Sequence, residues 1–409
     1  MKYIQSKDPS ASSHTLWQLC LYFLGLGTWG FGGPIALIGY MQRDLVEQKA
    51  WFTRDDFLEG LALSKLCPGP LASQLAIYLG WIQAGIWGAL CVALAFVLPS
   101  FLMVVGFAIF YVRAGYLPAM EAIFYGVGAA IVAIVLYSAI HLARNANEKD
   151  PFLWLIFLVS AGLIFATQIN PLWLFLSSGF FVLGIKKPEI FTKIFKGKLN
   201  NILFFPEIKA FGMSEIAEPL IRFSTMATQI ITQAPFWPLL QILFYFMYVG
   251  TFVFGSGLSI VPFLQNAVVY EYHWLTEKQF LDAVAVGLIT PGPMVVTVAF
   301  IGYLVAGMMG AVMAAIGIFL PCYLFVIFLA PHYRRLLKYV SIKLFVTGII
   351  SAASGAIFGA AIKLGKSSLV DLNTGLIFLG VFILVLTMRK VPSIIWLVMA
   401  GALGFILKL

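Results

Sequence analysis

The chain has 409 residues, of which 61% are hydrophobic and only 11% are charged, and its formal net charge is +9. Soluble domains are typically about 45–50% apolar and about 25% charged, so water is not the main solvent of this protein. The positive charge does not indicate a nucleic-acid partner, because basic residues gather between Lys186 and Lys209 and at the ends of apolar runs. Cytoplasmic loops of membrane proteins show that distribution, so the lipid bilayer is the predicted partner.

Apolar runs that could form membrane-crossing helices occur throughout the chain, since a crossing takes about 20 helical residues. In the first half they lie near 15–38, 86–112, 118–142, 152–169 and 171–185. In the second half they lie near 236–257, 308–330, 341–362, 374–388 and 392–407. The sequence therefore predicts an all-α polytopic membrane protein of about ten transmembrane helices, in two sets of five.

Each set contains two short apolar stretches joined by a Pro-Gly-Pro turn, between its first and second run. The turns are Pro68, Gly69 and Pro70 within residues 51–80, and Pro291, Gly292 and Pro293 within residues 274–304. A proline ends the helix before it and opens the next one, so each segment is expected to form helix, break, helix. Because each half-helix is too short to cross, the pattern predicts one re-entrant broken helix in each half.

The two halves are related by duplication, because matching residues recur at a nearly constant offset. Trp51 matches Trp274, and the first Pro-Gly-Pro turn matches the second, in both cases 223 residues apart. The predicted units are a first membrane repeat, a basic linker and a second membrane repeat, at 1–185, 186–235 and 236–409. Part of the linker, near 214–232, is either an amphipathic helix on the membrane surface or a plain tether.

Basic residues in the loops predict that the second repeat is inverted in the membrane. Five crossings per repeat would bring the second copy in from the opposite face, so equivalent loops should differ in charge. Loop 39–54 has three Lys or Arg residues, whereas the equivalent loop 262–278 has only Lys278. The difference is reversed at the next pair of loops: Arg113 is the only basic residue of the first, and the equivalent loop 331–343 has four. This bias places 39–54, 331–343 and the linker in the cytoplasm, and both termini outside.

The broken helices indicate an anion site. Half-helices that begin at Pro70 and Pro293 would point free N-terminal amides and positive dipole ends toward the middle of the membrane. Two such ends, facing each other across a pseudo-two-fold axis, would hold a tetrahedral dianion between them. The alternative is that each Pro-Gly-Pro sequence only forms a tight turn.

Further candidates surround these turns. The glycine-rich stretches 30–34 and 253–257 allow close approach of the backbone, to a ligand or only to a neighbouring helix. Glu59 and Asp282, at matching positions, either relay protons or lie at the wetted membrane edge. Lys65 lies deep in an apolar stretch and faces the anion, a carboxylate such as Glu59, or the surface. The candidate substrate-binding residues are Gly32, Gly33, Pro34, Glu59, Lys65, Pro68, Gly69, Pro70, Gln74, Gly255, Ser256, Gly257, Asp282, Pro291, Gly292, Pro293 and Thr297.

Nothing in the sequence predicts an enzyme, a cofactor or a metal ion. The cysteines lie singly in apolar segments, and neither an HExxH pattern nor a GxSxG elbow occurs. An intramembrane enzyme acting on lipid phosphates would need a nucleophile or a metal cluster at depth. A scaffold or receptor subunit would not need two broken helices at matching positions.

The sequence resembles the chromate ion transporters, often called ChrA proteins. The likeness lies in FGGPIALIGYMQRDLVE (31–47), EGLALSKLCPGPLASQLAIYLG (59–80) and TPGPMVVTVAFIGYLVAG (290–307). The resemblance implies fused inverted repeats that export chromate across the bacterial inner membrane and confer chromate resistance, with sulfate as a competitor. Lys65 departs from the family, where Gln is expected. Uptake of sulfate or another small anion is the alternative, and a homodimer is left open.

Overall fold

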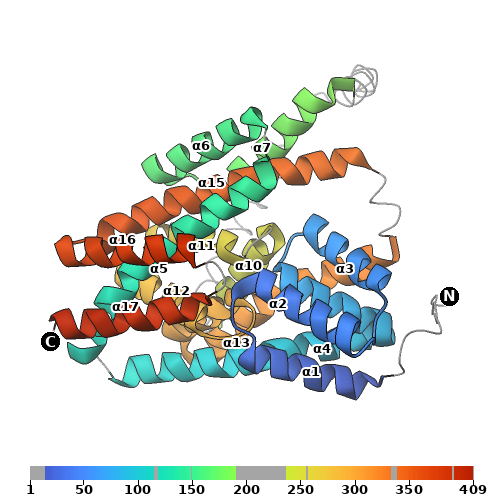
Figure 1. The fold of residues 1–409 in the computed structure, drawn as a ribbon, viewed down its shortest axis with the longest axis horizontal. Helices are drawn as coiled ribbons and strands as arrows, with labels where there is room; N and C mark the ends of the chain where they lie inside the picture. The colour runs from blue at the N-terminus through green and yellow to red at the C-terminus, as the bar shows by residue number, and fades with distance from the viewer. Residues whose placement is uncertain are drawn as a thin grey trace, which may run out of the picture.

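The computed structural model describes residues 14–114, 118–148, 150–189, 236–254, 257–332, 339–388 and 391–408. Every regular element within these ranges is a helix (Figure 1). Four helices are long and apolar enough to cross a membrane: Leu71–Arg113, Ala119–Asn147, Met294–His332 and Val340–Ser368. Many Leu, Phe and Trp side chains lie exposed on helix faces, where a bilayer would cover them. The chain is a multi-pass membrane protein, and the linker segment 214–232 lies outside the described residues.

In chain order the first half forms α1 (Leu16–Trp29), α2 (Gly33–Met41), the π-helix η1 (Gln42–Gln48), α3 (Arg54–Leu66), α4 (Leu71–Ala114), α5 (Pro118–Asn147), α6 (Pro151–Ala166) and α7 (Pro171–Lys186). The second half forms α10 (Trp237–Phe252), η2 (Gly257–Ser259), α11 (Ile260–Leu264), η3 (Gln265–Glu271), α12 (Glu277–Ile289), η4 (Met294–Val296), α13 (Thr297–Leu329), η5 (Ala330–His332), α15 (Val340–Ser368), α16 (Leu372–Thr387) and α17 (Ser393–Lys408). The duplication extends to backbone detail, since η1 and η3, and α3 and α12, begin and end 223 residues apart. Even the left-handed residues Ala50 and His273 match, with φ of 48° and 50°.

The apolar run at 15–38 does not form one membrane-crossing helix, so this expectation is wrong. α1 ends at Trp29, and the chain reverses through Gly32 and Gly33, whose φ angles are 111° and 76°. Glycine adopts such angles without strain, and Pro34 then opens α2. The sequence pattern concealed this turn because both arms of the hairpin are apolar.

Contacts between the two arms show that they run antiparallel. Tyr22 on α1 donates a hydrogen bond to Asp44 of η1, 3.3 Å away. His14 stacks on Trp51, with ring centroids 4.9 Å apart. His14, the first described residue, therefore lies at the same end of the molecule as loop 39–54. The prediction that the N-terminal end and this loop lie on opposite sides is wrong for residue 14, because 15–38 forms a hairpin and not a crossing.

The run at 236–257 is divided in the same way. α10 ends at Phe252, and the chain turns back into η2 and α11. Tyr245 on α10 donates to the backbone carbonyl of Phe263, 2.9 Å away. Each half therefore has two helical hairpins: a first-element hairpin (α1/α2 or α10/α11) and a Pro-Gly-Pro hairpin (α3/α4 or α12/α13), whose turn glycine is buried. The sequence predicted only the second kind. The expectation of five crossings in each half is wrong as well, because its first crossing is a hairpin in both.

α4 and α13 are each broken near their start. The backbone leaves helical geometry at Ala84 and Gly85, and again at the equivalent 306–307. A Cβ on Gly80 would lie 2.5 Å from the carbonyl oxygen of Gly88, so the chain folds back on itself at this break. The short arm before the break completes the Pro-Gly-Pro hairpin, and the long arm after it forms the predicted crossing near 86–112.

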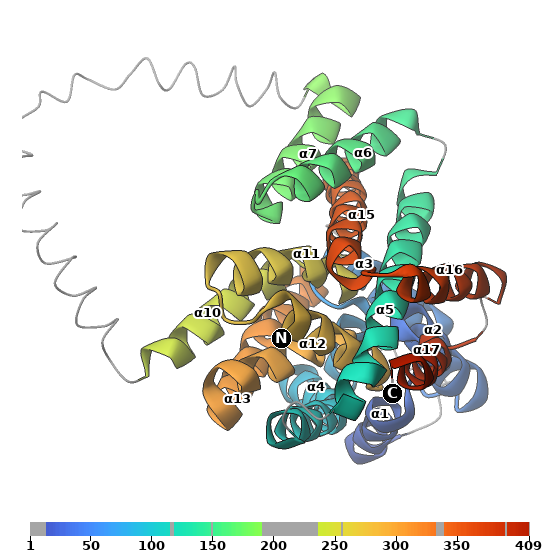
Figure 2. The same cartoon turned by 90° about the vertical axis from the view of Figure 1, so that its left-hand side faces the viewer.

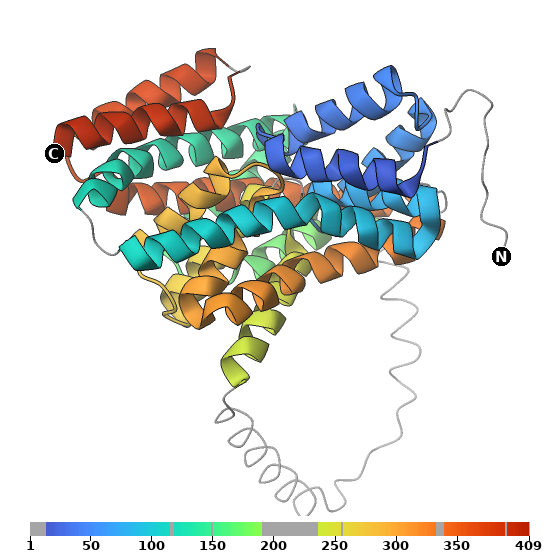
Figure 3. The same cartoon turned by 90° about the horizontal axis from the view of Figure 1, so that it is seen from below.

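Equivalent long helices of the two halves lie side by side and antiparallel. Along α4 and α13 (Figure 3), the Tyr111 and Phe300 rings lie 5.3 Å apart, while Tyr323 donates to the carbonyl of Ile86 at 3.1 Å. α5 packs beside α15, whereas the last two helices of each half are exchanged. α6 and α7 pack on α15, and α16 and α17 pack on α5 (Figure 2). The packing is therefore reciprocal between the two halves.

The fold-back of α4 predicts a sharp difference between two glycines on the same helix. Gly88→Leu should lower stability by about 1–3 kcal/mol or more, because its Cβ would lie 2.2 Å from the Gly80 carbonyl oxygen. Gly106→Leu should behave as wild type, because no atom lies within 4 Å of a Cβ there. Melting temperature in detergent and the amount of protein in the membrane measure both effects. Equal stability of the two variants would contradict the close approach.

Candidate functional site

The two Pro-Gly-Pro turns are each hydrogen-bonded to the opposite half of the molecule. Gly69 donates its N–H to the carbonyl of Val253, with an N···O distance of 2.5 Å. Gly292 donates its N–H to the carbonyl of Gly30, with an N···O distance of 2.9 Å. Gly30 and Val253 are themselves equivalent and lie at the tips of the first-element hairpins. Each Pro-Gly-Pro turn therefore meets the first-element hairpin of the other repeat in the protein interior.

Backbone angle and space both require glycine in these turns. Gly69 and Gly292 are buried and have φ angles of 135° and 87°. A Cβ on Gly69 would lie 2.6 Å from Gln74 Nε2, and one on Gly292 would lie 2.1 Å from Ser100 Oγ. Larger residues would disrupt the fold whether or not an anion binds, so substitutions of these glycines cannot locate the substrate.

The half-helices that follow the turns differ in their first residues. α4 begins as an α-helix at Leu71, directly after Pro70. After Pro293 the chain first forms the 3₁₀ turn η4, in which Val296 donates its N–H to the carbonyl of Pro293 at 3.0 Å. The α-helix of the second half begins only at Thr297. The two expected anion-binding ends are therefore not equivalent.

The predicted residues Gln74 and Thr297 lie at matching positions just after the turns. Both are buried. Gln74 donates from Nε2 to the carbonyl of Pro68 at 2.5 Å, which braces the first turn. Thr297 donates from Oγ1 to the carbonyl of Met294 at 2.8 Å, within its own helical turn.

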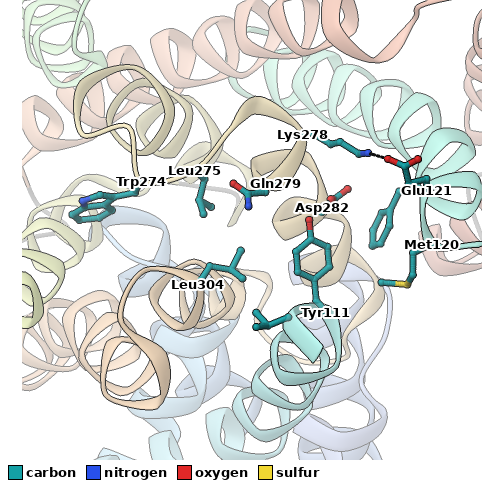
Figure 4. Close-up of a pocket in the computed structure, with 11 residues that line it drawn as sticks. Tyr111, Met120, Glu121, Trp274, Leu275, Lys278, Gln279, Asp282 and Leu304 are labelled. Atoms are coloured by element: carbon teal, nitrogen blue, oxygen red, sulfur yellow. Dashed lines mark hydrogen bonds and ion pairs between the residues drawn. The ribbon is translucent and has the colours of Figure 1, made fainter. Parts of the chain in front are cut away.

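Asp282 lies away from the turns, in a cavity built by both halves (Figure 4). Asp282 is only 4% exposed, and the hydroxyl of Tyr111, from the first half, donates a hydrogen bond to its carboxylate at 2.8 Å. An ion pair between Lys278 and Glu121, 2.6 Å long and partly exposed, lies beside it. The cavity has a volume of about 290 Å³ and is lined by α4, α5, α12 and α13.

Sequence reasoning missed Tyr111 as a partner of Asp282. The two residues are 171 positions apart in the chain, and no local pattern connects them. Glu59, the counterpart of Asp282, is half-buried on α3. The two carboxylates therefore sit in different surroundings, although their positions match.

The remaining predicted residues are divided between the turns and the surface. Lys65 lies on the exposed side of the last turn of α3, and no ion pair between it and Glu59 is found among the described residues. Gly32, Gly33 and Pro34 form the tip of the α1/α2 hairpin. Gly257 begins η2, and a Cβ there would lie 3.5 Å from Met294. Gly255 and Ser256 lie outside the described residues.

Comparison with known proteins identifies the family to which this chain belongs. Residues 17–183 and 240–405 each match the chromate transporter family. The chain belongs to that family. A chromate transport protein of Cupriavidus metallidurans is 48% identical over 398 residues, which is 97% of this chain and 94% of the relative. A probable chromate transport protein of Synechococcus elongatus is 45% identical over 397 residues, which is 96% of each chain.

A shorter relative corresponds to a single repeat of this transporter. An uncharacterised transporter of Bacillus subtilis is 31% identical over 170 residues, which is 39% of this chain and 84% of the relative. A protein about half as long as this chain therefore exists as a separate chain, as expected if duplication and fusion of such a protein produced the longer transporter. No solved structure matches this chain.

The hydrogen bond between Tyr111 and Asp282 predicts energetic coupling between the two halves. Tyr111→Phe should lower stability by about 1–3 kcal/mol, because it leaves a buried carboxylate without this donor. Combining it with Asp282→Asn should cost less than the sum of the single changes, by about 0.5–3 kcal/mol. Thermal unfolding of the four proteins in detergent measures the cycle. Strictly additive effects would show that the bond contributes nothing.

Proposed function

We propose that this protein is a secondary transporter that exports chromate across the inner membrane and thereby confers chromate resistance. The names of the relatives that are 48% and 45% identical to it support chromate as the substrate. One structural observation carries the transport mechanism: two broken helices whose tips are buried and bonded to the opposite half. Broken helices at membrane depth are tolerated where they are enclosed by protein or line a path for solute. Sulfate, which has the same tetrahedral shape, is the expected competitor.

The membrane potential favours export of such an anion. Moving one charge is worth about 2.3 kcal/mol per 100 mV, so a dianion that leaves a negative interior gains about 4.6 kcal/mol. Uptake would need co-transported cations. Chromate accumulation in everted membrane vesicles, with and without sulfate, tests the direction of transport. Accumulation only in right-side-out vesicles would support the alternative, which is uptake of sulfate or another small anion.

The proposed mechanism places the two repeats in the bilayer in opposite orientations. Two observations support this: the antiparallel packing of α4 against α13, and the exchange of basic residues between equivalent loops. An inverted pair presents the same pathway to each side of the membrane in turn. The loop 39–54 then faces the cytoplasm, and the loop 262–278 faces outward.

Cysteine labelling tests this orientation at equivalent sites. Gln48→Cys at the end of η1 and Glu271→Cys at the end of η3 are both exposed positions. In a chain without native cysteines, an impermeant maleimide added to intact cells should label Glu271→Cys and leave Gln48→Cys unlabelled until the cells are opened. Labelling of both from the same side would refute the inverted arrangement.

Lys65 is proposed to attract the anion toward the first Pro-Gly-Pro turn. It is three residues from Pro68, and its counterpart in the second half is Leu288. Lys65→Gln should raise the half-saturating chromate concentration by roughly tenfold, and Lys65→Glu should raise it further by repelling the anion. Lys366→Gln, which removes an exposed lysine from the last turn of α15, is the matched control and should leave the value unchanged. Equal values for Lys65→Gln and wild type would remove Lys65 from the pathway.

A further inference from the structure

The two Pro-Gly-Pro turns share one backbone design but carry different side chains. Where the first turn has a polar or charged residue, the equivalent position in the second half has an apolar residue or one whose polar atom is already hydrogen-bonded within its own turn. The matched pairs, each 223 positions apart, are Lys65 with Leu288, Ser73 with Val296, and Gln74 with Thr297. A site shared equally by both turns would need similar donors on both, and this chain does not provide them.

The first turn, unlike the second, also has buried polar side-chain atoms without a hydrogen-bond partner among the described residues. Ser73 and Gln74 are 2% and 0% exposed, and Ser73 Oγ and Gln74 Oε1 have no hydrogen-bond partner within the described residues. At the second turn Val296 has no polar side-chain atom, and Thr297 Oγ1 is already bonded to Met294. A buried polar atom without a partner is costly, by about 1–3 kcal/mol, so such atoms mark places where a ligand or a water binds.

The orientation of the Gln74 amide follows from its neighbour. The carbonyl of Pro68 can only accept a hydrogen bond, so the amide nitrogen of Gln74 must face it, at 2.5 Å. The oxygen Oε1 is therefore turned away from that carbonyl. The amide group lies directly against the turn, because a Cβ on Gly69 would meet it at 2.6 Å. The polar head of Gln74 is thus directed at the start of α4.

The start of α4 supplies donors at the same place. The first N–H groups of an α-helix have no acceptor within the helix, and they carry the positive end of the helix dipole. α4 begins directly after Pro70, and Ser73 and Gln74 belong to its first turn. Free backbone amides, a buried hydroxyl and a buried amide oxygen therefore all belong to the first turn of one helix.

We propose that the oxyanion binds at the first Pro-Gly-Pro turn alone, with Ser73 as a direct ligand and Gln74 as a positioning residue. This inference rests on the proposed transport of chromate. The Ser73 hydroxyl and the free amides of α4 donate to anion oxygens. Gln74 Oε1 holds a water molecule that donates one hydrogen to it and the other to the anion. The second turn braces the opposite half and does not bind the anion.

A reciprocal exchange at equivalent positions tests this assignment. Ser73→Val gives the first turn the residue of the second, and Val296→Ser does the reverse. Ser73→Val should raise the dissociation constant for chromate, measured on purified protein in detergent, by roughly tenfold to a hundredfold. Val296→Ser should leave it unchanged. Binding should saturate at one chromate per chain in the wild type.

Two further variants separate loss of a ligand from damage to the fold. Ser73→Ala removes only the hydroxyl and should weaken binding as Ser73→Val does, without lowering the melting temperature. Ser73→Thr keeps the hydroxyl and should restore binding. Weak binding by both Ser73→Ala and Ser73→Thr, with wild-type melting temperatures, would show that the hydroxyl is not the ligand and would overturn the assignment.

Other results would also overturn it. If Thr297→Val weakened binding as much as Gln74→Met, both turns would contact the anion. If every Ser73 variant bound chromate as the wild type does, the unsatisfied atoms would hold water only. Failure of the wild type to transport chromate in vesicles would refute the proposed function. Wild-type transport combined with equal effects at both turns would refute only the site.

Discussion

The structure depends on two backbone hydrogen bonds that join each Pro-Gly-Pro turn to the opposite repeat. Neither proline of a turn has an N–H group, so the central glycine provides the only donor of each tripeptide. Inside an apolar interior that donor must find a partner. Gly69 finds it at Val253 and Gly292 finds it at Gly30. Because the arrangement is reciprocal, each half supplies the acceptor that the turn of the other half needs.

This constraint explains why the architecture is symmetric while the side chains are not. The backbone bonds involve glycines and carbonyl oxygens, which duplication preserved in both halves. Side chains that do not take part in these bonds were free to diverge. Asp282 is buried beside Tyr111 in a cavity, whereas Glu59 is half-buried. Ser73 likewise corresponds to Val296 in the second half. The shared backbone bonds are therefore structural, and the side chains that differ give each half contacts that the other half lacks.

Sequence patterns predicted the helical class, the duplication and the Pro-Gly-Pro breaks, because proline and glycine act locally on the backbone. They failed at 15–38 and 236–257, where both arms of a hairpin are apolar and hydropathy does not distinguish a crossing from a reversal. The positive φ angles at Gly32 and Gly33 make that reversal, but glycine in a membrane segment also serves close helix packing. The cross-repeat bonds were beyond prediction, since no local signal pairs Gly69 with Val253.

The atoms that hold the two turns in place differ from the atoms proposed to bind the anion, so the two roles can be tested separately. Only glycine fits at positions 69 and 292, because the φ angles are positive and neighbouring atoms lie too close for a side chain. Replacing either glycine would therefore disrupt the turn and its hydrogen bond to the opposite half. Gln74 belongs to both categories, because its nitrogen braces Pro68 while its oxygen stays unbonded. In the proposed site Ser73 serves recognition only, since its hydroxyl bonds to nothing in the described part of the chain. A buried polar atom without a partner in the protein indicates where a ligand or a water can supply the missing hydrogen bond, and at Ser73 the free amides of α4 favour an anion.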